Sequence, residues 1–207
     1  MVTTRNSSLP NRKRAANVEA SFQKLDWQKI LFSEIPGRSD LPAQKPGWPC
    51  QDIKIHIHQN QPFEYITSAM PCFLAFSGYA GQFIHSSYDD SLNFEARDEA
   101  DVELIWLDFE RYSLDDGFEV FSNWLSERLA KLREISQAPI LVSDCIDRIK
   151  GAPQINKLLH SIACTVPDIY ICEQSKIASA LGADYLSPRM KRISGSPISD
   201  AAYVLTA

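Results

Sequence analysis

Residues 102–109 read VELIWLDF, a run in which apolar side chains dominate until an aspartate near the carboxyl end. A short apolar run of this kind is typical of a buried β-strand. Asp108 lies near the end of the predicted strand, where open parallel sheets bind their ligands. This stretch therefore predicts a strand of the core and the first place to look for a functional site.

Helical and strand-like segments alternate after this strand. Between residues 117 and 135 apolar residues recur every three or four positions, which predicts an amphipathic helix. Strands are predicted at 139–143 and 168–172, and helices at 155–164, 174–181 and 199–207. Because strands separated by helices favour parallel crossovers, we expect an α/β, three-layer, Rossmann-like fold: a mostly parallel sheet with helices on both faces.

Three more strands are predicted upstream. Residues 29–35 (KILFSEI) and 72–76 (CFLAF) are short apolar runs, and residues 52–58 (DIKIHIH) alternate strictly between isoleucine and polar residues. The alternation predicts a half-buried strand toward an edge of the sheet. His56 and His58 would then lie on its polar outer face. Histidines at this spacing can bind zinc, but no third ligand is evident, so we predict neither a metal nor a cofactor.

Composition excludes several classes of protein. A net charge of −5 argues against a broad nucleic-acid-binding surface. The five cysteines form no CxxC pair, which indicates reduced thiols, and no segment has the apolar length of a signal peptide or membrane span. We therefore expect a soluble, cytoplasmic protein without nucleic-acid or membrane partners.

Two regions are predicted. Residues 1–24 are polar and carry the basic run NRKR, which is typical of a solvated tail. Residues 25–207 suffice for one α/β domain, since a domain of this size buries roughly 70% of its unfolded surface. The apolar segment 199–207 ends without a helix cap or a polar stretch, so we expect the full gene product to continue beyond it.

Polar residues just after the predicted strands outline a candidate binding crevice. They are Ser33, Glu34, Ser77, Gly78, Gly81, Asp108, Glu110, Ser143 and Asp144. The two glycines stand in the stretch GYAG, which lacks the GxGxxG spacing and any GK(S/T) ending, so no nucleotide is predicted there.

Asp108 and Glu110 invite comparison with one phosphatase loop. The stretch Asp108-Phe109-Glu110 resembles the DxDx(T/V) loop with which phosphatases of the haloacid dehalogenase type bind Mg²⁺ and form an aspartyl-phosphate. Here the second acid is Glu, and Tyr112 stands where Thr or Val is expected. A complete site of that type is therefore not expected, and Mg²⁺ would be needed only under this alternative.

Ser33 offers a second alternative, a serine hydrolase of the SGNH type, in which the nucleophile follows the first strand. Its context FSEIPG is not GDSL, and residues 187–190 stand where the customary DxxH is expected. A serine nucleophile needs a base, so His85 or His160 would have to reach it in space. The expectation of an esterase or acyltransferase thus depends on a histidine beside Ser33, with Asp108 or Glu110 as the acidic partner.

Several stretches together resemble the amino-terminal domain of FkbH-like proteins, a branch of the haloacid dehalogenase superfamily. They are KILFSEI, YDDSLNF (88–94), ADVELIWLDFERYS (100–113), WLSERLAKLR (124–133), PILVSD (139–144) and ALGADYLSPRMKRISGSPIS (180–199). In that family an SGNH-like domain, flavodoxin-like in architecture, precedes the phosphatase-like domain. The family's catalytic DLDxTLWxG-type motif is not found in these residues.

The resemblance implies an accessory or recognition domain without a complete catalytic set. It places Ser33 at the nucleophile position, Gly78 or Gly81 at the glycine position, and Asp108 to Glu110 at the GxND position, with no match to the terminal Asp-His pair. The implied partners are a haloacid dehalogenase-like domain in the same protein and an acyl carrier protein. The implied pathways are polyketide biosynthesis, where such proteins load glyceryl units from a phosphorylated three-carbon donor, and polysaccharide biosynthesis.

Overall fold

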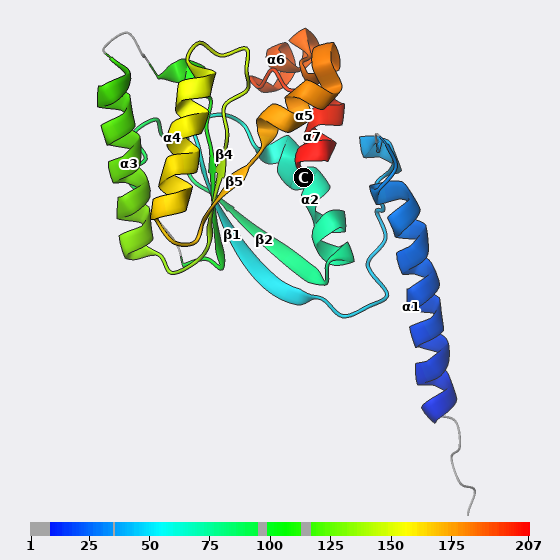
Figure 1. Ribbon diagram of the computed structural model, residues 1–207. Coiled ribbons are helices and arrows are strands. Elements are labelled where there is room, and N and C mark those ends of the chain that lie inside the picture. Colours follow the sequence, from blue (N-terminus) through cyan, green and yellow to red (C-terminus); the bar gives the residue numbers. More distant parts are fainter. Residues whose placement is uncertain (1–8, 35, 95–98, 113–116) are drawn as a thin grey trace, which may run out of the picture.

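The computed structural model describes residues 9–34, 36–94, 99–112 and 117–207 (Figure 1). Its centre is a parallel sheet of five strands in the order β2-β1-β3-β4-β5. The strands are β1 Gln51–Gln59, β2 Tyr79–His85, β3 Val102–Trp106, β4 Ile140–Ser143 and β5 Ile169–Cys172. The predicted α/β, Rossmann-like fold class is confirmed.

Helices cover both faces of the sheet, which makes three layers (Figure 1). One face carries α3 and α4, and the other carries α2, α5, α6 and α7. The helices are α1 Leu9–Leu31, α2 Glu64–Phe76, α3 Phe118–Ile135, α4 Ala152–Thr165, α5 Gln174–Leu181, α6 Pro188–Ser194 and α7 Asp200–Thr206, with short 3₁₀ turns at Arg38–Asp40, Phe109–Arg111 and Gly182–Tyr185.

The strand order places a switch point between β1 and β3. The chain leaves β1 through α2 on one face and leaves β3 through α3 on the other. Loops that diverge in this way leave a crevice at the carboxyl ends of the two strands, where doubly wound sheets bind ligands. Asn60 follows β1 and Asp108 follows β3, so both residues lie at this point.

The strand predicted at residues 29–35 is wrong, because α1 runs to Leu31. Trp27 and Leu31, one helical turn apart, are buried, whereas Phe32 is exposed. Burial therefore follows the helical period rather than the alternation of a strand. Helix α1 also runs through the boundary predicted at residue 24.

The strand predicted at residues 72–76 is also wrong, since these residues end α2. The buried positions of this helix are Ile66, Ala69, Cys72 and Ala75, spaced by three residues. The edge strand β2 was not predicted. Its side chains are half-buried or exposed, so it lacks the apolar run that marks the inner strands.

The strand at 52–58 exists as part of β1, but its predicted place near an edge is wrong. β1 lies between β2 and β3, and His56 and His58 are only 1% and 4% exposed. Ile55 and Ile57 face the core under α2, while Leu92 and Phe94 of the β2–β3 connection help to cover the histidine face. The described part of this connection contains no helix.

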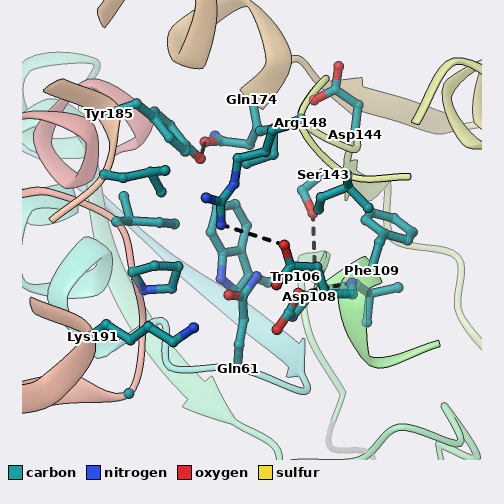
Figure 2. A pocket seen from close by; sticks show the side chains of 18 residues that line it. Gln61, Trp106, Asp108, Phe109, Ser143, Asp144, Arg148, Gln174, Tyr185 and Lys191 are labelled. Atoms are coloured by element: carbon teal, nitrogen blue, oxygen red, sulfur yellow. Dashed lines mark hydrogen bonds and ion pairs between the residues drawn. The ribbon is translucent and has the colours of Figure 1, made fainter. Parts of the chain in front are cut away.

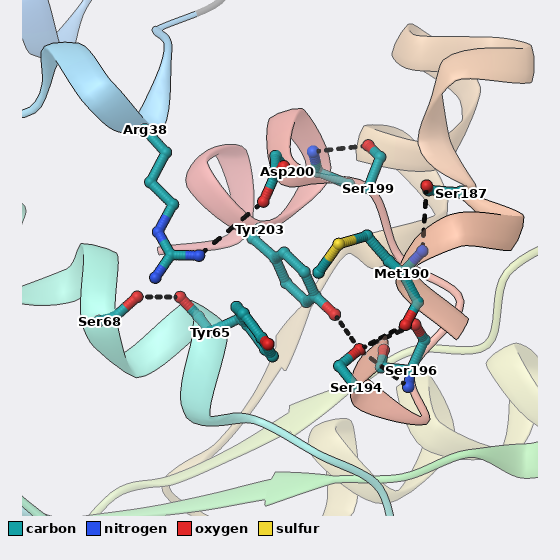
Figure 3. A network of polar contacts seen from close by, with 11 residues as sticks. Arg38, Tyr65, Ser68, Ser187, Met190, Ser194, Ser196, Ser199, Asp200 and Tyr203 are labelled. Atoms are coloured by element: carbon teal, nitrogen blue, oxygen red, sulfur yellow. Dashed lines mark hydrogen bonds and ion pairs between the residues drawn. The ribbon is translucent and has the colours of Figure 1, made fainter. Parts of the chain in front are cut away.

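The segment from α6 to α7 is fixed to the rest of the fold by a network of polar and aromatic contacts (Figure 3). Tyr203 of α7 stacks on Tyr65 of α2 with ring centroids 5.3 Å apart, and Arg38 lies 3.9 Å from Asp200. The Ser187 hydroxyl accepts a 3.3 Å hydrogen bond from the Met190 amide and so caps α6. In the part of the chain that the structure describes, no helix has both the length and the apolarity required to cross a membrane.

Candidate functional site

A pocket of about 80 Å³ opens at the carboxyl ends of the central strands (Figure 2). Residues that follow β1, β3, β4 and β5 contribute to its walls, and α6 closes one side. We call it the carboxyl-end pocket. Its polar side chains are those of Gln61, Asp108, Glu110, Ser143, Asp144, Arg148, Gln174, Tyr185 and Lys191.

Asp108 is held at the switch point by two hydrogen bonds. Its backbone amide donates to the Asn60 side chain at 2.7 Å, and its carboxylate accepts from the Glu110 amide at 3.0 Å. Burial raises the pKa of this carboxyl group above its ordinary value, and the nearby Glu110 charge raises it further. Asp108 is therefore a fixed, partly desolvated acceptor that lines the carboxyl-end pocket.

Two cations share the pocket with this carboxylate. Arg148, in the loop after β4, forms an ion pair with Glu110 at 3.6 Å, and Figure 2 shows its guanidinium extending into the pocket. Lys191 extends into the pocket from α6 on the other side, and its charge acts to lower the pKa of Asp108. The pocket thus combines hydrogen-bond acceptors with positive charge.

The residues that end β4 have structural partners. The Ser143 hydroxyl accepts from the Leu107 amide at 3.5 Å and so bridges β3 and β4. Asp144 accepts from the Ser175 amide at 2.8 Å and from the Ser175 hydroxyl, so it caps the amino end of α5. Burial raises the pKa of Asp144. Its carboxylate is consequently committed to α5.

Gln174 and Tyr185 join the pocket wall to the C-terminal helix. The Tyr185 hydroxyl donates to the Gln174 side-chain oxygen at 3.3 Å, and the Thr206 hydroxyl donates to the same atom at 3.1 Å. Burial raises the pKa of Tyr185, so its hydroxyl stays protonated at neutral pH. A ligand in the pocket therefore meets a wall whose shape depends on α7.

Ser33 and Glu34 lie elsewhere than predicted. Because residues up to Leu31 are helical, they follow the end of α1 rather than a strand, and both are exposed. The Ser33 hydroxyl donates to the Ile30 carbonyl at 2.9 Å, and none of its described hydrogen bonds involves a histidine. The hypothesis of a serine esterase therefore loses the strand position on which it was built.

The histidines considered as bases have other surroundings. His85, at the end of β2, contacts the Thr67 hydroxyl and the Gln59 side chain, each at 3.3 Å. His160 is exposed on α4. Neither residue lines the carboxyl-end pocket.

Ser77, Gly78 and Gly81 lie near the amino end of β2 and not after the carboxyl end of a strand, because the segment predicted as a strand before them is α2. Ser77 and Gly78 form the turn into β2, and Gly78 has a φ of +90° that favours glycine. A Cβ on Gly81 would stand 2.6 Å from a Leu74 side-chain carbon, so this glycine lets α2 pack against β2. None of the three lines the carboxyl-end pocket.

A second group of polar residues lies on the sheet itself. Within the described residues, one cluster has three side chains whose ligand atoms are close enough to hold a metal ion, and it consists of His56, His58 and Glu103. The third ligand is not evident from the sequence, because Glu103 is 45 residues from His58 along the chain. The acidic residues of the carboxyl-end pocket form no such cluster among the described residues.

No protein-family profile matches this chain, and no curated protein matches its sequence. The fold does have a solved counterpart, the N-terminal part of the protein BF1531 from Bacteroides fragilis, containing a phosphatase domain and complexed with Mg. The TM-score is 0.60 at 13% sequence identity, over 75% of this chain and 50% of that one. The chain thus shares an α/β fold with that solved chain and spans about half of its length.

Proposed function

We propose that this chain is a recognition domain that binds a small phosphorylated hydroxy compound in the carboxyl-end pocket. The observation that carries the proposal is that Asp108 lines a pocket of about 80 Å³ together with two cations, Lys191 and Arg148, the second of which pairs with Glu110. Cationic side chains form strong, charge-assisted hydrogen bonds with phosphate oxygens. A fixed carboxylate accepts hydrogen bonds from hydroxyl groups. The mixed lining therefore suits a ligand that carries both a phosphate group and hydroxyl groups.

The wider setting that we propose is an FkbH-like protein of the cytoplasm. The sequence resemblance described above and the fold similarity to a protein that contains a phosphatase domain support it. In this setting the chain lies beside a haloacid dehalogenase-like domain and helps to load a phosphorylated three-carbon unit onto an acyl carrier protein, in polyketide or polysaccharide biosynthesis. The phosphate and hydroxyl groups of such a unit match the lining of the carboxyl-end pocket.

Lys191→Met is expected to weaken the binding of glycerol 3-phosphate about tenfold, because it removes one charge-assisted contact worth roughly 1.5–3 kcal/mol, reduced here by the exposure of the side chain. Isothermal titration calorimetry of the purified chain measures this change. Lys176→Met is the matched control, since Lys176 is exposed on α5 and pairs with Glu173 instead. The assignment of Lys191 would be refuted if the parent chain bound glycerol as tightly as glycerol 3-phosphate. It would also be refuted if Lys191→Met and Lys176→Met lost the same amount of affinity for glycerol 3-phosphate.

A magnesium-dependent phosphatase with Asp108 as nucleophile is the second candidate, supported by the place of Asp108 at the end of the central strand. The residues present do not fit a protein-held Mg²⁺ well, since Asp144 is engaged by Ser175 and the pocket acids form no three-ligand cluster among the described residues. We therefore derive no step through the metal. Hydrolysis of p-nitrophenyl phosphate that depends on both Mg²⁺ and Asp108 would establish this candidate in place of the first.

Asp108→Asn is expected to make the protein more stable at neutral pH. Burial raises the pKa of Asp108 in the folded state, so its contribution to stability is greatest below the unfolded pKa of about 4 and is lost as the pH rises through the folded pKa. Asparagine stays neutral and can still accept from the Glu110 amide. Urea unfolding should therefore show a gain at pH 7 that vanishes near pH 3.5.

Asp147→Asn, at an exposed position in the loop after β4, is the matched control for that comparison and should leave the midpoint nearly unchanged at both pH values. If Asp108→Asn instead destabilised the protein at pH 7 and did so less at pH 3.5, the surroundings would favour the charged carboxylate.

A further inference from the structure

We propose that His56, His58 and Glu103, which we call the His–Glu cluster, bind a divalent transition-metal ion of the Zn²⁺ type. The site is separate from the carboxyl-end pocket and lies on the sheet face under the β2–β3 connection. Its three ligand atoms lie within 4.8 Å of one another.

The sheet register brings the three side chains together. His56 of β1 pairs directly with Glu103 of β3, and His58 is two residues further along the same face of β1. The imidazole rings stack with centroids 4.3 Å apart and an angle of 26° between their planes. The two rings are therefore nearly parallel, and that of His58 has its Nε2 beside the Glu103 carboxylate of the neighbouring strand.

Burial distinguishes this cluster from a surface group of charges. His56, His58 and Glu103 are 1%, 4% and 0% exposed, although an apolar side chain would be expected at each position in the middle of a parallel sheet. Three ionisable groups are costly to bury unless they are paired or coordinate a metal ion. By contrast, Ile105, two residues after Glu103 on the same face of β3, is apolar and packs into the core.

The contacts of Glu103 orient the cluster as supporting residues orient metal ligands. One carboxylate oxygen lies 2.8 Å from His58 Nε2, and the other accepts from the Ser136 hydroxyl at 2.8 Å. A hydroxyl on the distal oxygen of a ligating carboxylate fixes its direction. In a tetrahedral zinc site with bonds of about 2.0–2.1 Å, ligand atoms stand roughly 3.4 Å apart. To admit the ion, His58 Nε2 and the Glu103 oxygen need only move slightly apart from their 2.8 Å contact, while the His56 ligand atom moves closer to both.

A cavity supplies space for a fourth ligand. It measures about 470 Å³, and both histidines line it together with His85 at the end of β2 and with Tyr88 and Asp89 of the β2–β3 connection. Two histidines, one glutamate and an open position form the ligand set of zinc sites that keep a bound water. The same donors would bind other first-row divalent ions, and Zn²⁺ is favoured over Fe²⁺ by the general order of affinities.

A purely structural network is the rival explanation, in which His58 and Glu103 only pair with each other. Zinc titration of the metal-free chain by calorimetry separates the two. We expect one Zn²⁺ per chain, an affinity reduced on the order of 100-fold in His58→Gln and Glu103→Gln, and roughly tenfold in Ser136→Ala. Co²⁺ bound at the same site should give the visible absorption bands of tetrahedral coordination, which a structural network does not produce.

His160→Gln is the matched control, because His160 is exposed on α4, and it should bind Zn²⁺ as the parent chain does. Lys191→Met should do so as well, since that variant alters only the carboxyl-end pocket. Circular dichroism verifies that each variant is folded before titration. Failure of the parent chain to bind Zn²⁺, or an equal loss in His160→Gln and His58→Gln, would overturn the proposal whatever the other variants do.

Discussion

Glu103→Ala is expected to lower the free energy of unfolding by about 3–5 kcal/mol when measured without metal, because it removes the buried carboxylate that hydrogen-bonds both His58 and the Ser136 hydroxyl. Glu103 has no solvent exposure and holds both His58 and the Ser136 hydroxyl. Alanine would also leave a void in the middle of β3. Urea unfolding in the presence of EDTA gives the value.

Ser136→Ala provides the scale for this result. It removes one hydrogen bond to the same carboxylate and should cost only about 1 kcal/mol, so the difference between the two variants reports on the pair of His58 and Glu103. A double-mutant cycle with His58→Gln isolates that pair from the void. If Glu103→Ala lowered the free energy of unfolding no more than Ser136→Ala does, the contact between His58 and Glu103 would contribute little to stability.

The sequence predicts the last three strands and the amphipathic helix α3 well, for a physical reason. Strands β3, β4 and β5 include short apolar runs, and α3 buries Phe121, Leu125, Leu129 and Leu132 at helical spacing. In these segments the local pattern and the tertiary environment favour the same structure. Prediction fails where an apolar run is only part of a longer helix, as at Leu31 in α1 and Cys72 in α2.

The candidate site divides in a similar way. Asp108 and Ser143 could be placed at the same end of the sheet from sequence, because the carboxyl ends of all strands in a parallel sheet lie at that end. Lys191 could not, since it reaches the carboxyl-end pocket only through the docking of α6. Glu103 could not be predicted as a partner of His58, because their contact depends on the pairing of β1 with β3. Hydrophobic periodicity carries no information about which strands are neighbours.

Tyr203→Ala is expected to destabilise the protein by about 3–5 kcal/mol, the range for removing a large aromatic ring from a core. Tyr203 is fully buried, stacks on Tyr65 of α2, and has its hydroxyl 3.5 Å from that of Ser194 at the end of α6 (Figure 3). The lost ring therefore loosens α7 from the sheet layer and α6 from α7. Urea unfolding measures the first effect.

Tyr203→Phe separates the ring from the hydroxyl group. It keeps the stack on Tyr65 and gives up only the long contact to Ser194, so it should cost less than about 1 kcal/mol. Because α6 carries Lys191, Tyr203→Ala should also weaken glycerol 3-phosphate binding at temperatures where the variant is still folded, although Tyr203 does not line the carboxyl-end pocket. Unchanged affinity in a destabilised variant would show that α6 is held in place without α7, and that the pocket wall is set by the contacts of Ser187 and Met190 alone.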